Sequence, residues 1–398
     1  MKKYFFLFFL FFNFSFFSQE IENSKVFCTE KLNTDSIIKE LKIYKNSILN
    51  STYSKDRLVY FLPHEFYIPL MYAYEVNDKA LKNIFQSFLN KELFLKIKND
   101  SNVNILDKYI FYFFLAEFVR LDSSNIKSNK ELFSILTLEL NDIWNLYEGK
   151  VWEREKLHFK GKKERVYSIL KNKNNGKLSY YKAITDKELF PLAMGSSLFL
   201  SQTKYNLENR ILKEIVDAFT EVFKELVKFY DDGTWVLQPN IWKDHRDYKN
   251  VKLNTGEDVV WDSSHFSRIP AFLNLLSLCH IDSKDDLNYL YIKKLKLGLT
   301  YQFVNKICYQ DVFKDMYQFT NFVNGNDSSF RVGYYNNGKG YNASENYKHV
   351  FWGWWKLLNN SEIDQVYEKL NTDFYKYFNI GKGQNRKSSI YKEIINLK

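Results

Sequence analysis

Apolar residues recur at helical spacing along most of this chain, and this periodicity constrains the fold more than any other feature. The clearest stripe joins Leu81, Ile84, Phe85, Phe88 and Leu89, at positions i, i+3, i+4, i+7 and i+8. Only 14 glycines and 5 prolines interrupt the 398 residues, too few for the many turns of an all-β sandwich. Hydrophobic residues make up 45% of the chain, which excludes a disordered protein. The sequence therefore predicts an all-α protein.

The same patterns, with their capping residues, predict about twelve helices that pair as six hairpins. The expected helices are 35–49, a helix whose start is bracketed by Pro63 and Pro69, 81–89, 105–121, 131–147, a Lys-rich partner to about 171, a helix from Asp186, 206–230, 262–278, 287–307, 344–358 and 361–378. The tail from Gly381 is expected to fray. Hairpins joined in this way indicate an α/α toroid, a complete or incomplete six-hairpin barrel with long functional loops. A helical solenoid is the alternative, but the chain shows no fixed repeat period.

Residues 1–18 have the composition of a secretory signal peptide. Lys2 and Lys3 precede an apolar run over 4–17, and Ser18 precedes a polar start. The run is shorter than the roughly 20 residues that span a bilayer, which disfavours the alternative of a membrane anchor. We expect cleavage near Ser18 and a secreted or periplasmic mature protein without stable membrane insertion. No linker divides the remainder, so 19–398 is expected to form a single domain.

The first of two long loops, 234–260, leads into a helix start that carries three ionisable residues. Asp262, His265 and Arg268 are spaced three apart, so a helix places them on one face. A carboxylate one turn before an imidazole orients that ring and raises its basicity, which suits a general acid or base. Arg268 adds a fixed positive charge that grips a carboxylate. The alternative is that Asp262 only caps the helix and pairs with Arg268.

The second long loop, 309–342, continues into a Gly- and Tyr-rich stretch that ends at His349. It brings Arg331, Tyr334, Tyr341 and Glu345 close together in the sequence. Phenol hydroxyls are suited to hydrogen bonds with sugar hydroxyls, and the glycines allow the backbone to approach a ligand. We expect Tyr341 to act as a catalytic group and the other three to bind substrate. The alternative is an ordinary Asn- and Gly-rich surface loop.

Aromatic and amide side chains of the first loop complete the expected substrate site. Trp235 and Trp261 offer indole faces that stack on a pyranose ring, and Asn240 offers an amide. The tryptophans of the later Trp-rich segment, Trp352, Trp354 and Trp355, are expected to be mostly core.

Metal, nucleotide and nucleic-acid chemistry are disfavoured. Asp244, His245, Asp262 and His265 form a mixed oxygen and nitrogen set, but none of the close zinc spacings is present, so we expect no metal and no other cofactor. No Walker loop, dinucleotide-binding glycine motif or G-x-S-x-G motif occurs. The net charge of +10 is spread along the chain and not clustered, so nucleic acid is not an expected partner. The cysteines are too few for a disulfide framework.

Cys279 and Cys308 are the two cysteines whose state the sequence leaves open. In an oxidising setting they are expected either to pair or to remain buried thiols.

Four segments of the C-terminal half follow one another in a recognisable order. They are PLAMGSSLFL at 191–200, the Trp-containing loop 234–242, the Asp-x-x-His helix start at 262–265 and the Gly- and Trp-rich segment 333–355. This order resembles secreted bacterial α/α-toroid proteins related to polysaccharide lyases and six-hairpin glycosidases. The resemblance implies a carbohydrate-active cleft near Asp262, His265 and Arg268.

The leading functional hypothesis is a polysaccharide lyase that cleaves an anionic, uronate-containing glycan by β-elimination. In that reaction Arg268 or Arg331 meets the uronate carboxylate, and His265 or a tyrosine of the second loop acts as base or acid. The alternatives are a glycoside hydrolase that pairs Asp258 or Asp262 with Glu345, and a non-catalytic glycan-binding protein. The expected partner in each case is a polysaccharide or oligosaccharide. Each hypothesis requires the two long loops to meet at one concave surface.

Overall fold

The computed structural model describes residues 34–50, 57–152, 157–171, 178–281, 286–311, 315–342, 347–378 and 386–397. The predicted signal peptide, the predicted helix cap Ser344 and the site candidate Glu345 lie outside these residues. The described part is mostly helical, with two short β-hairpins, and this confirms the all-α prediction.

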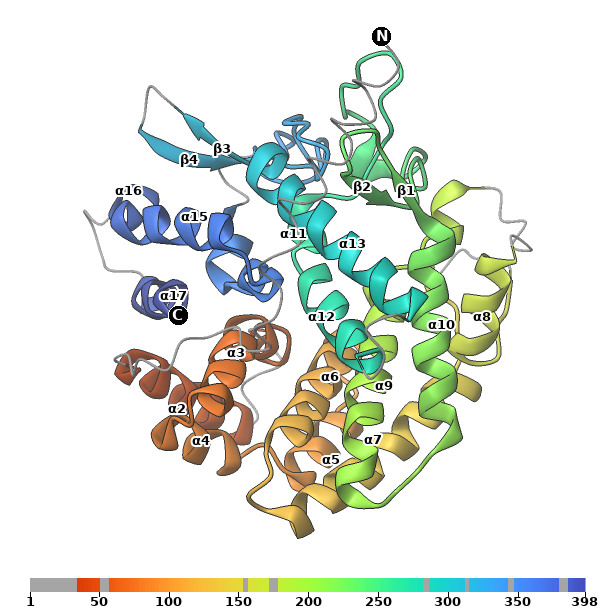
Figure 1. The fold of residues 1–398 in the computed structure, drawn as a ribbon, viewed down its shortest axis with the longest axis vertical. Helices are drawn as coiled ribbons and strands as arrows, with labels where there is room; N and C mark the ends of the chain where they lie inside the picture. The colour runs from red at the N-terminus through yellow and green to blue at the C-terminus, as the bar shows by residue number, and fades with distance from the viewer. Residues whose placement is uncertain are drawn as a thin grey trace, which may run out of the picture.

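The N-terminal half of the chain is a succession of α-helices (Figure 1). Their bounds are α2 (Asp35–Leu49), α3 (Leu58–Glu75), α4 (Lys79–Gln86), α5 (Lys91–Asn99), α6 (Ile105–Leu121), α7 (Ile126–Asn145), α8 (Gly161–Leu170), α9 (Asp186–Tyr205) and α10 (Arg210–Leu226), with a 3-10 turn η1 (Ser179–Lys182) before α9. Side-chain caps begin several of them. Thr185 and Glu188 form a reciprocal capping box at the start of α9, which fixes where that helix begins.

The C-terminal half is more irregular. It contains the hairpin β1 (Val227–Phe229) with β2 (Trp235–Leu237), η2 (Arg246–Tyr248), α11 (Ser263–Phe266), α12 (Ile269–Cys279), α13 (Leu287–Gln302), the π-helical turn η3 (Phe303–Ile307), the hairpin β3 (Cys308–Asp311) with β4 (Met316–Phe319), the 3-10 turns η4 (Tyr347–Trp352) and η5 (Trp354–Leu358), and the helices α15 (Ser361–Thr372), α16 (Phe374–Tyr377) and α17 (Arg386–Asn396). Both hairpins are antiparallel, with Lys228 opposite Val236 and Tyr309 opposite Gln318.

Several segments differ from the sequence prediction, among them α5, which was not predicted, and the predicted helix 262–278, which is divided into α11 and α12. Three of the differences have a clear physical cause. Helix α3 begins at Leu58 and continues through Pro63 and Pro69, because its residues are buried on nearly every side and packing outweighs the missing hydrogen bonds. The Trp-rich segment is two 3-10 turns separated by Gly353, whose φ of 78° breaks the helix. The tail forms α17, since Ile390 and Ile394 are buried against α2 and α15.

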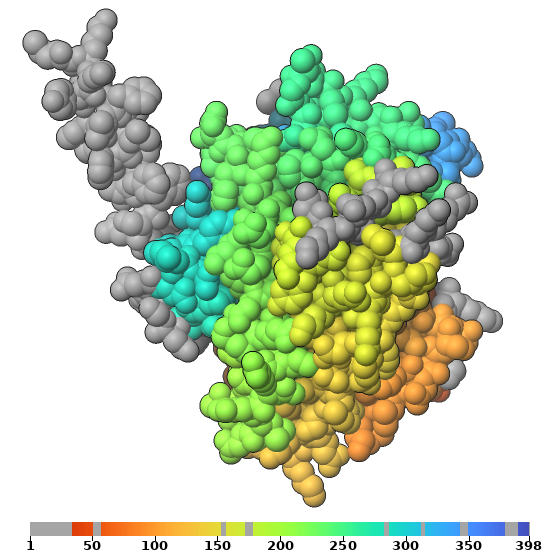
Figure 2. Space-filling model, turned by 90° about the vertical axis from the view of Figure 1, so that its right-hand side faces the viewer, coloured from red at the N-terminus to blue at the C-terminus, as the bar shows by residue number. Residues whose placement is uncertain are grey.

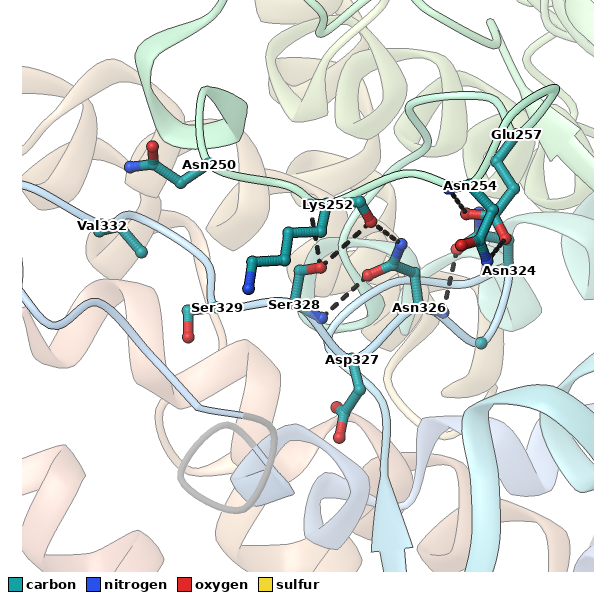
Figure 3. Close-up of a pocket in the computed structure, with 11 residues that line it drawn as sticks. Asn250, Lys252, Asn254, Glu257, Asn324, Asn326, Asp327, Ser328, Ser329 and Val332 are labelled. Atoms are coloured by element: carbon teal, nitrogen blue, oxygen red, sulfur yellow. Dashed lines mark hydrogen bonds between the residues drawn. The ribbon is translucent and has the colours of Figure 1, made fainter.

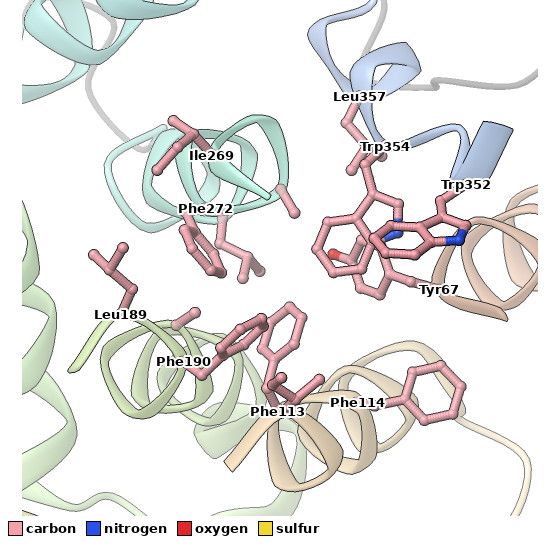
Figure 4. Close-up of a cluster of buried hydrophobic side chains, with 14 of the residues drawn as sticks. Tyr67, Phe113, Phe114, Leu189, Phe190, Ile269, Phe272, Trp352, Trp354 and Leu357 are labelled. Atoms are coloured by element: carbon pink, nitrogen blue, oxygen red, sulfur yellow. The ribbon is translucent and has the colours of Figure 1, made fainter. Parts of the chain in front are cut away.

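Four helices and the Trp-rich turns follow one another around a common centre. Helix α3 contacts α6, α6 contacts α9, α9 contacts α12, α12 contacts η5, and η4 returns to α3. Figure 4 shows that their aromatic side chains fill this centre. The ring centroids of Phe113, Phe190 and Phe272 lie 5.3–6.1 Å apart, and Tyr67 lies 4.7 Å from Trp354. The middle of the molecule is therefore packed with side chains.

The remaining helices pack outside these elements. Helices α4 and α5 lie against α3 and α6, α7 and α10 lie against α9, α13 lies against α12, and α15 and α17 lie against η5 and η4. Figure 2 shows one outer face, on which α7, α8 and α10 lie side by side. The buried apolar side chains form one continuous cluster from α2 to α17. Cys279 and Cys308 are both free thiols, so they do not pair.

Candidate functional site

A cavity of about 220 Å³ lies at the end of the molecule where α6, α9 and α11 begin. The loops that precede α11 and η4, together with Val151 and Trp152 after α7, complete its lining. Its aromatic residues are Trp152, Trp242, Tyr248, Trp261 and Phe330. Its ionisable residues are Asp186, Lys187, His245, Asp247, Asp262, His265 and Arg331. Both long loops that the sequence analysis singled out therefore contribute to one concave surface.

Asp262 and His265 form a closely bonded pair at this cavity. The Nδ1 of His265 lies 2.9 Å from Oδ1 and 2.7 Å from Oδ2 of Asp262. Because a carboxylate only accepts, Nδ1 carries the hydrogen, and the Nε2 of a neutral His265 keeps a lone pair. Asp262 is 1% exposed, whereas the His265 side chain is 33% exposed. The buried carboxylate thus orients the imidazole through Nδ1, while part of the ring remains exposed to a ligand.

The environment of Asp262 keeps its carboxylate ionised. Burial opposes ionisation, but the charge and hydrogen bonds of His265 hold the pKa of Asp262 well below its usual range. Asp262 also accepts a hydrogen bond from the main-chain N–H of His265 at 3.0 Å and one from the hydroxyl of Tyr248 at 3.2 Å. It is therefore both the cap of α11 and the partner of the imidazole, roles that the sequence analysis treated as alternatives.

Arg268 lies in the interior, behind this pair. It is 1% exposed, and its guanidinium forms an ion pair with Asp186 at 3.1 Å. It also donates to His64 Nε2 at 3.0 Å and to the Tyr60 hydroxyl at 2.8 Å. Burial, followed by the charge of Arg268, holds the pKa of His64 well below its usual value, so this imidazole is neutral. Arg268 is therefore fully occupied within the protein, and the expectation that it binds a substrate carboxylate or pairs with Asp262 is wrong.

Arg331 takes the position at the cavity that was expected for Arg268. Its Nε donates to Asp247 Oδ2 at 3.1 Å, and its side chain is 31% exposed. Asp247 also accepts from the hydroxyl of Tyr334. The nearby charges of Asp262 and Asp247 outweigh burial and raise the pKa of Arg331. The guanidinium of Arg331 lies over the Phe330 ring, but its terminal nitrogens have no hydrogen-bond partner among the described residues, so a cation with two open donor groups lines the cavity.

His245 is a second imidazole of the cavity. The main-chain N–H of Asp247 donates to its Nδ1 at 3.3 Å, so the neutral ring carries its hydrogen on Nε2. Burial lowers the pKa of His245. Rings of Trp152, Tyr180 and Trp242 surround it, with centroids 4.8–5.7 Å away. The cavity therefore holds one imidazole that accepts at Nε2 and one that donates there.

The tyrosines of the second loop do not line the cavity. Tyr341 stacks on Tyr335 at a centroid distance of 3.8 Å, and burial raises its pKa. Tyr334 is 43% exposed and reaches the site only through Asp247. The loop residues that do line the cavity are Phe330 and Arg331.

Two further candidates from the first loop lie away from the cavity. Trp235 is 0% exposed and its Nε1 donates to Leu295 O at 2.8 Å, so it has no face for a sugar, contrary to expectation. Asn240 holds its own loop together by donating to Asp258 at 2.7 Å and accepting from the main-chain N–H of Val259. Trp261 is the substrate-binding candidate of this loop that lines the cavity.

A larger hollow of about 700 Å³ lies beside the same loops (Figure 3). Its side chains are mostly polar and bonded to their own surroundings: Asn326 Nδ2 donates to Lys252 O at 2.7 Å, and Asn254 Nδ2 donates to Glu257 at 2.9 Å. Ser329 and Val332 line this hollow, while the residues between them line the cavity. The cavity, and not the hollow, combines imidazoles, carboxylates and a guanidinium.

Several cavity residues carried little signal in the sequence. Asp186 was recognised only as a helix start, and Trp152 was not singled out. His245 was considered only as a metal ligand, although the charged run DHRDY, 244–248, supplies three residues of the lining. Within the described ranges, no group of three or more His, Cys, Asp or Glu side chains is placed to hold a metal ion. None of the described helices is long and apolar enough to cross a membrane.

The structure therefore defines a mostly helical protein with an aromatic cavity that holds an oriented imidazole, a guanidinium and three carboxylates. Comparison of the chain with family models, with curated proteins and with solved structures finds no match in any of the three.

Proposed function

We propose that this protein is a secreted carbohydrate-active enzyme, a polysaccharide lyase that cleaves an anionic, uronate-containing glycan by β-elimination. The observation that carries the proposal is the Asp262–His265 pair at the cavity, with the open terminal nitrogens of Arg331 in the same lining. Elimination needs a base beside a group that neutralises the uronate carboxylate, and the cavity offers both.

In the proposed reaction His265 is the proton-transfer group. Its Nε2 removes the proton at C5 of the uronate, the electron pair forms the C4–C5 double bond, and the bond from C4 to the leaving oxygen breaks. The same imidazolium then returns the proton to that oxygen. Asp262 stabilises the imidazolium, since a buried carboxylate that stays ionised favours the charged ring. No further reactant is required.

The proposed role of Arg331 is to bind the uronate carboxylate. Neutralising this group lowers the energy of the carbanion that forms when C5 loses its proton. The first turns of α6 and α9 also face the cavity through Leu106, Asp186 and Lys187, and helix N-termini favour negative charge. The net charge of +10 attracts an acidic polymer at long range.

We further propose that the helices form an α/α toroid. The closed sequence of contacts from α3 through α6, α9, α12 and η5 back to α3 supports this arrangement, with the remaining helices as the outer layer. In this interpretation the Trp-rich 3-10 turns take the place of an inner helix, and the cavity lies at the end where the inner helices begin.

Glycoside hydrolysis is the second candidate, because Asp186, Asp247 and Asp262 all line the cavity. A hydrolase needs one carboxyl group that stays protonated as the general acid. Asp262 is held ionised, Asp186 is paired with Arg268, and Asp247 is paired with Arg331. Asp258, which the sequence analysis offered beside Asp262 as a partner of Glu345, bonds to Lys228 and lies outside the lining. Elimination therefore fits the arrangement better.

The test is incubation with alginate, pectate and glycosaminoglycans while recording the ultraviolet absorbance of the unsaturated product. The full-length protein is expected to produce that absorbance with at least one polymer, and His265→Ala to lose it. His158→Ala is the matched control, because His158 is 74% exposed, pairs with Glu148 and lies outside the cavity lining. Reducing ends without absorbance would indicate hydrolysis, and binding without cleavage would indicate a glycan-binding protein.

A further inference from the structure

Three tryptophans of the cavity have indole N–H groups without a hydrogen-bond partner. Trp152, Trp242 and Trp261 line the cavity, and the Nε1 of each is buried with no acceptor in the described part of the chain. Trp242 is 7% exposed and Trp261 is 3% exposed. Elsewhere in the described part of the chain, Trp144, Trp235 and Trp354 donate to protein oxygens at 2.8–3.1 Å, whereas the Nε1 atoms of Trp352 and Trp355 are also buried without a partner.

A buried N–H without a partner is costly. Leaving one unsatisfied costs about 1–3 kcal/mol, and most buried polar groups in folded proteins are paired. Three such donors around one cavity of about 220 Å³ are therefore evidence that something else supplies the acceptors.

The same cavity lining also contains a buried hydrogen-bond acceptor that has no partner in the described part of the chain. Asp186 is 6% exposed and its Oδ2 pairs with Arg268 at 3.1 Å. Its Oδ1 is buried and has no donor among the described residues. A ligand that satisfies this cavity must both accept hydrogen bonds from indoles and donate one to a carboxylate. Hydroxyl groups do both.

We propose that the cavity is a subsite for one sugar ring, whose hydroxyls accept from the indole N–H groups of Trp152, Trp242 and Trp261 and donate to Asp186 Oδ1. This inference rests on the proposed function in taking a glycan as the ligand, and it names the groups that select the ring. The volume corresponds to about seven water molecules at ~30 Å³ each, which suits one ring and not a longer segment. The aromatic rings of the same residues cover the apolar faces of the sugar.

The proposal predicts coupling between individual hydroxyls and individual indoles. The probes are methyl glycosides of mannuronate, glucuronate and galacturonate, together with their single-deoxy analogues, titrated calorimetrically against the full-length protein. At least one glycoside is expected to bind. One deoxy analogue of it is expected to bind about 3- to 10-fold more weakly, the usual effect of one hydrogen bond.

The decisive comparison is a double-mutant cycle with Trp→Phe variants, which remove the N–H and keep an aromatic ring. In Trp261→Phe, or in Trp242→Phe, the loss of binding affinity caused by removing one sugar hydroxyl is expected to shrink to less than about 2-fold. Trp355→Phe is the matched control, because Trp355 also has a buried, unpaired Nε1 but lies outside the cavity lining. That variant is expected to bind every probe as the unmodified protein does.

Two results would overturn the proposal: no binding of any glycoside by the unmodified protein, or the same deoxy penalty in every tryptophan variant. Thermal unfolding of each variant shows whether it is folded, and if Trp261→Phe does not fold, Trp242→Phe carries the test. The proposed lyase reaction is refuted by a different result. If the deoxy penalty depends on the tryptophan variant but no polymer gives an unsaturated product, the lyase is refuted and the sugar subsite is supported.

Discussion

Replacing Asp262 by Asn tests the pair on which the proposed chemistry depends. The carboxylate accepts from the Nδ1–H and main-chain N–H of His265 and from the Tyr248 hydroxyl. The amide in Asp262→Asn keeps one oxygen as an acceptor, but its NH2 group replaces the other oxygen and faces hydrogen-bond donors. Two hydrogen bonds that the charged carboxylate accepts are therefore lost. Each contributes about 1.5–3 kcal/mol, and the amide recovers part of this. We expect a loss of about 2–4 kcal/mol in the free energy of unfolding.

The same substitution changes the imidazole itself. Without a carboxylate at Nδ1, the ring no longer has to carry its hydrogen there, and Nε2 loses its role as base. If His265 is the catalytic base, the rate of elimination falls by roughly 10³- to 10⁴-fold, as found when an orienting Asp is replaced in catalytic triads. Urea unfolding and the ultraviolet assay measure the two effects separately.

The pH dependence of the stability loss has a definite sign. The pKa of Asp262 is lowered on folding, so its stabilising contribution is present above the pKa of an unfolded Asp, about 3.9, and is lost as the pH falls below that value. The gap between the unmodified protein and Asp262→Asn therefore shrinks in acid. Asp217→Asn, at an exposed ion pair with Lys213, is expected to change stability by less than about 0.5 kcal/mol. Equal stability and activity of Asp262→Asn and Asp217→Asn would refute the reasoning.

Three further predictions concern a buried ion pair, a closely packed glycine and a buried lysine. Arg268→Met leaves Asp186 buried without its cation and is expected to cost about 3–5 kcal/mol in urea unfolding; a loss below 1 kcal/mol would contradict the buried ion pair. Gly161→Ala places Cβ against the main chain of Trp144 and should cost about 3 kcal/mol or more, whereas Gly233→Ala, also at positive φ but in open space, should cost about 1–2 kcal/mol. Burial lowers the pKa of Lys296 to about 8, so its charged form destabilises the fold below that pH. Lys296→Met should therefore add about 1–3 kcal/mol at pH 7, and the gain should disappear by about pH 10.4; a gain independent of pH would contradict this.

Helices with strong local signals could be predicted from the sequence. The expected ranges 35–49 and 105–121 are α2 and α6, because the amphipathic spacing of the first and the dense apolar run of the second, which Asn104 caps, leave few alternatives. Segments whose conformation depends on distant contacts were predicted poorly. The polar tail becomes α17 only because α2 and α15, far away in the sequence, cover its isoleucines.

In the candidate site, too, contacts between neighbours in the sequence could be predicted and contacts between distant segments could not. The spacing of Asp262 and His265 predicted their contact, since three residues along a helix start bring the side chains together. The spacing of Arg268 predicted in the same way that its side chain would face the site. The sequence does not show that His64 and Tyr60 of α3 and Asp186 of α9 enclose this side chain. Polar residue types identify ionisable groups, whereas the tertiary contacts decide which of them face a ligand.

The tyrosines illustrate a further limit. Tyr334 and Tyr341 lie in the loop that reaches the cavity, yet the residues that line it are Phe330 and Arg331. Arg331 has a φ of 61° and its N–H bonds to the main-chain oxygen of Asp247, so the loop turns at this point. A conformation of this kind depends on its partner loop and is not encoded by spacing alone.

The most direct measurement of the central claim is a crystal structure of His265→Ala with a bound uronate oligosaccharide, since removal of the base prevents turnover. The account predicts one sugar ring in the cavity, with its carboxylate at the terminal nitrogens of Arg331 and its C5 facing the space left by the imidazole. A ligand bound in the polar hollow lined by Lys252 and Asn326, with the cavity closed to it, would contradict the account.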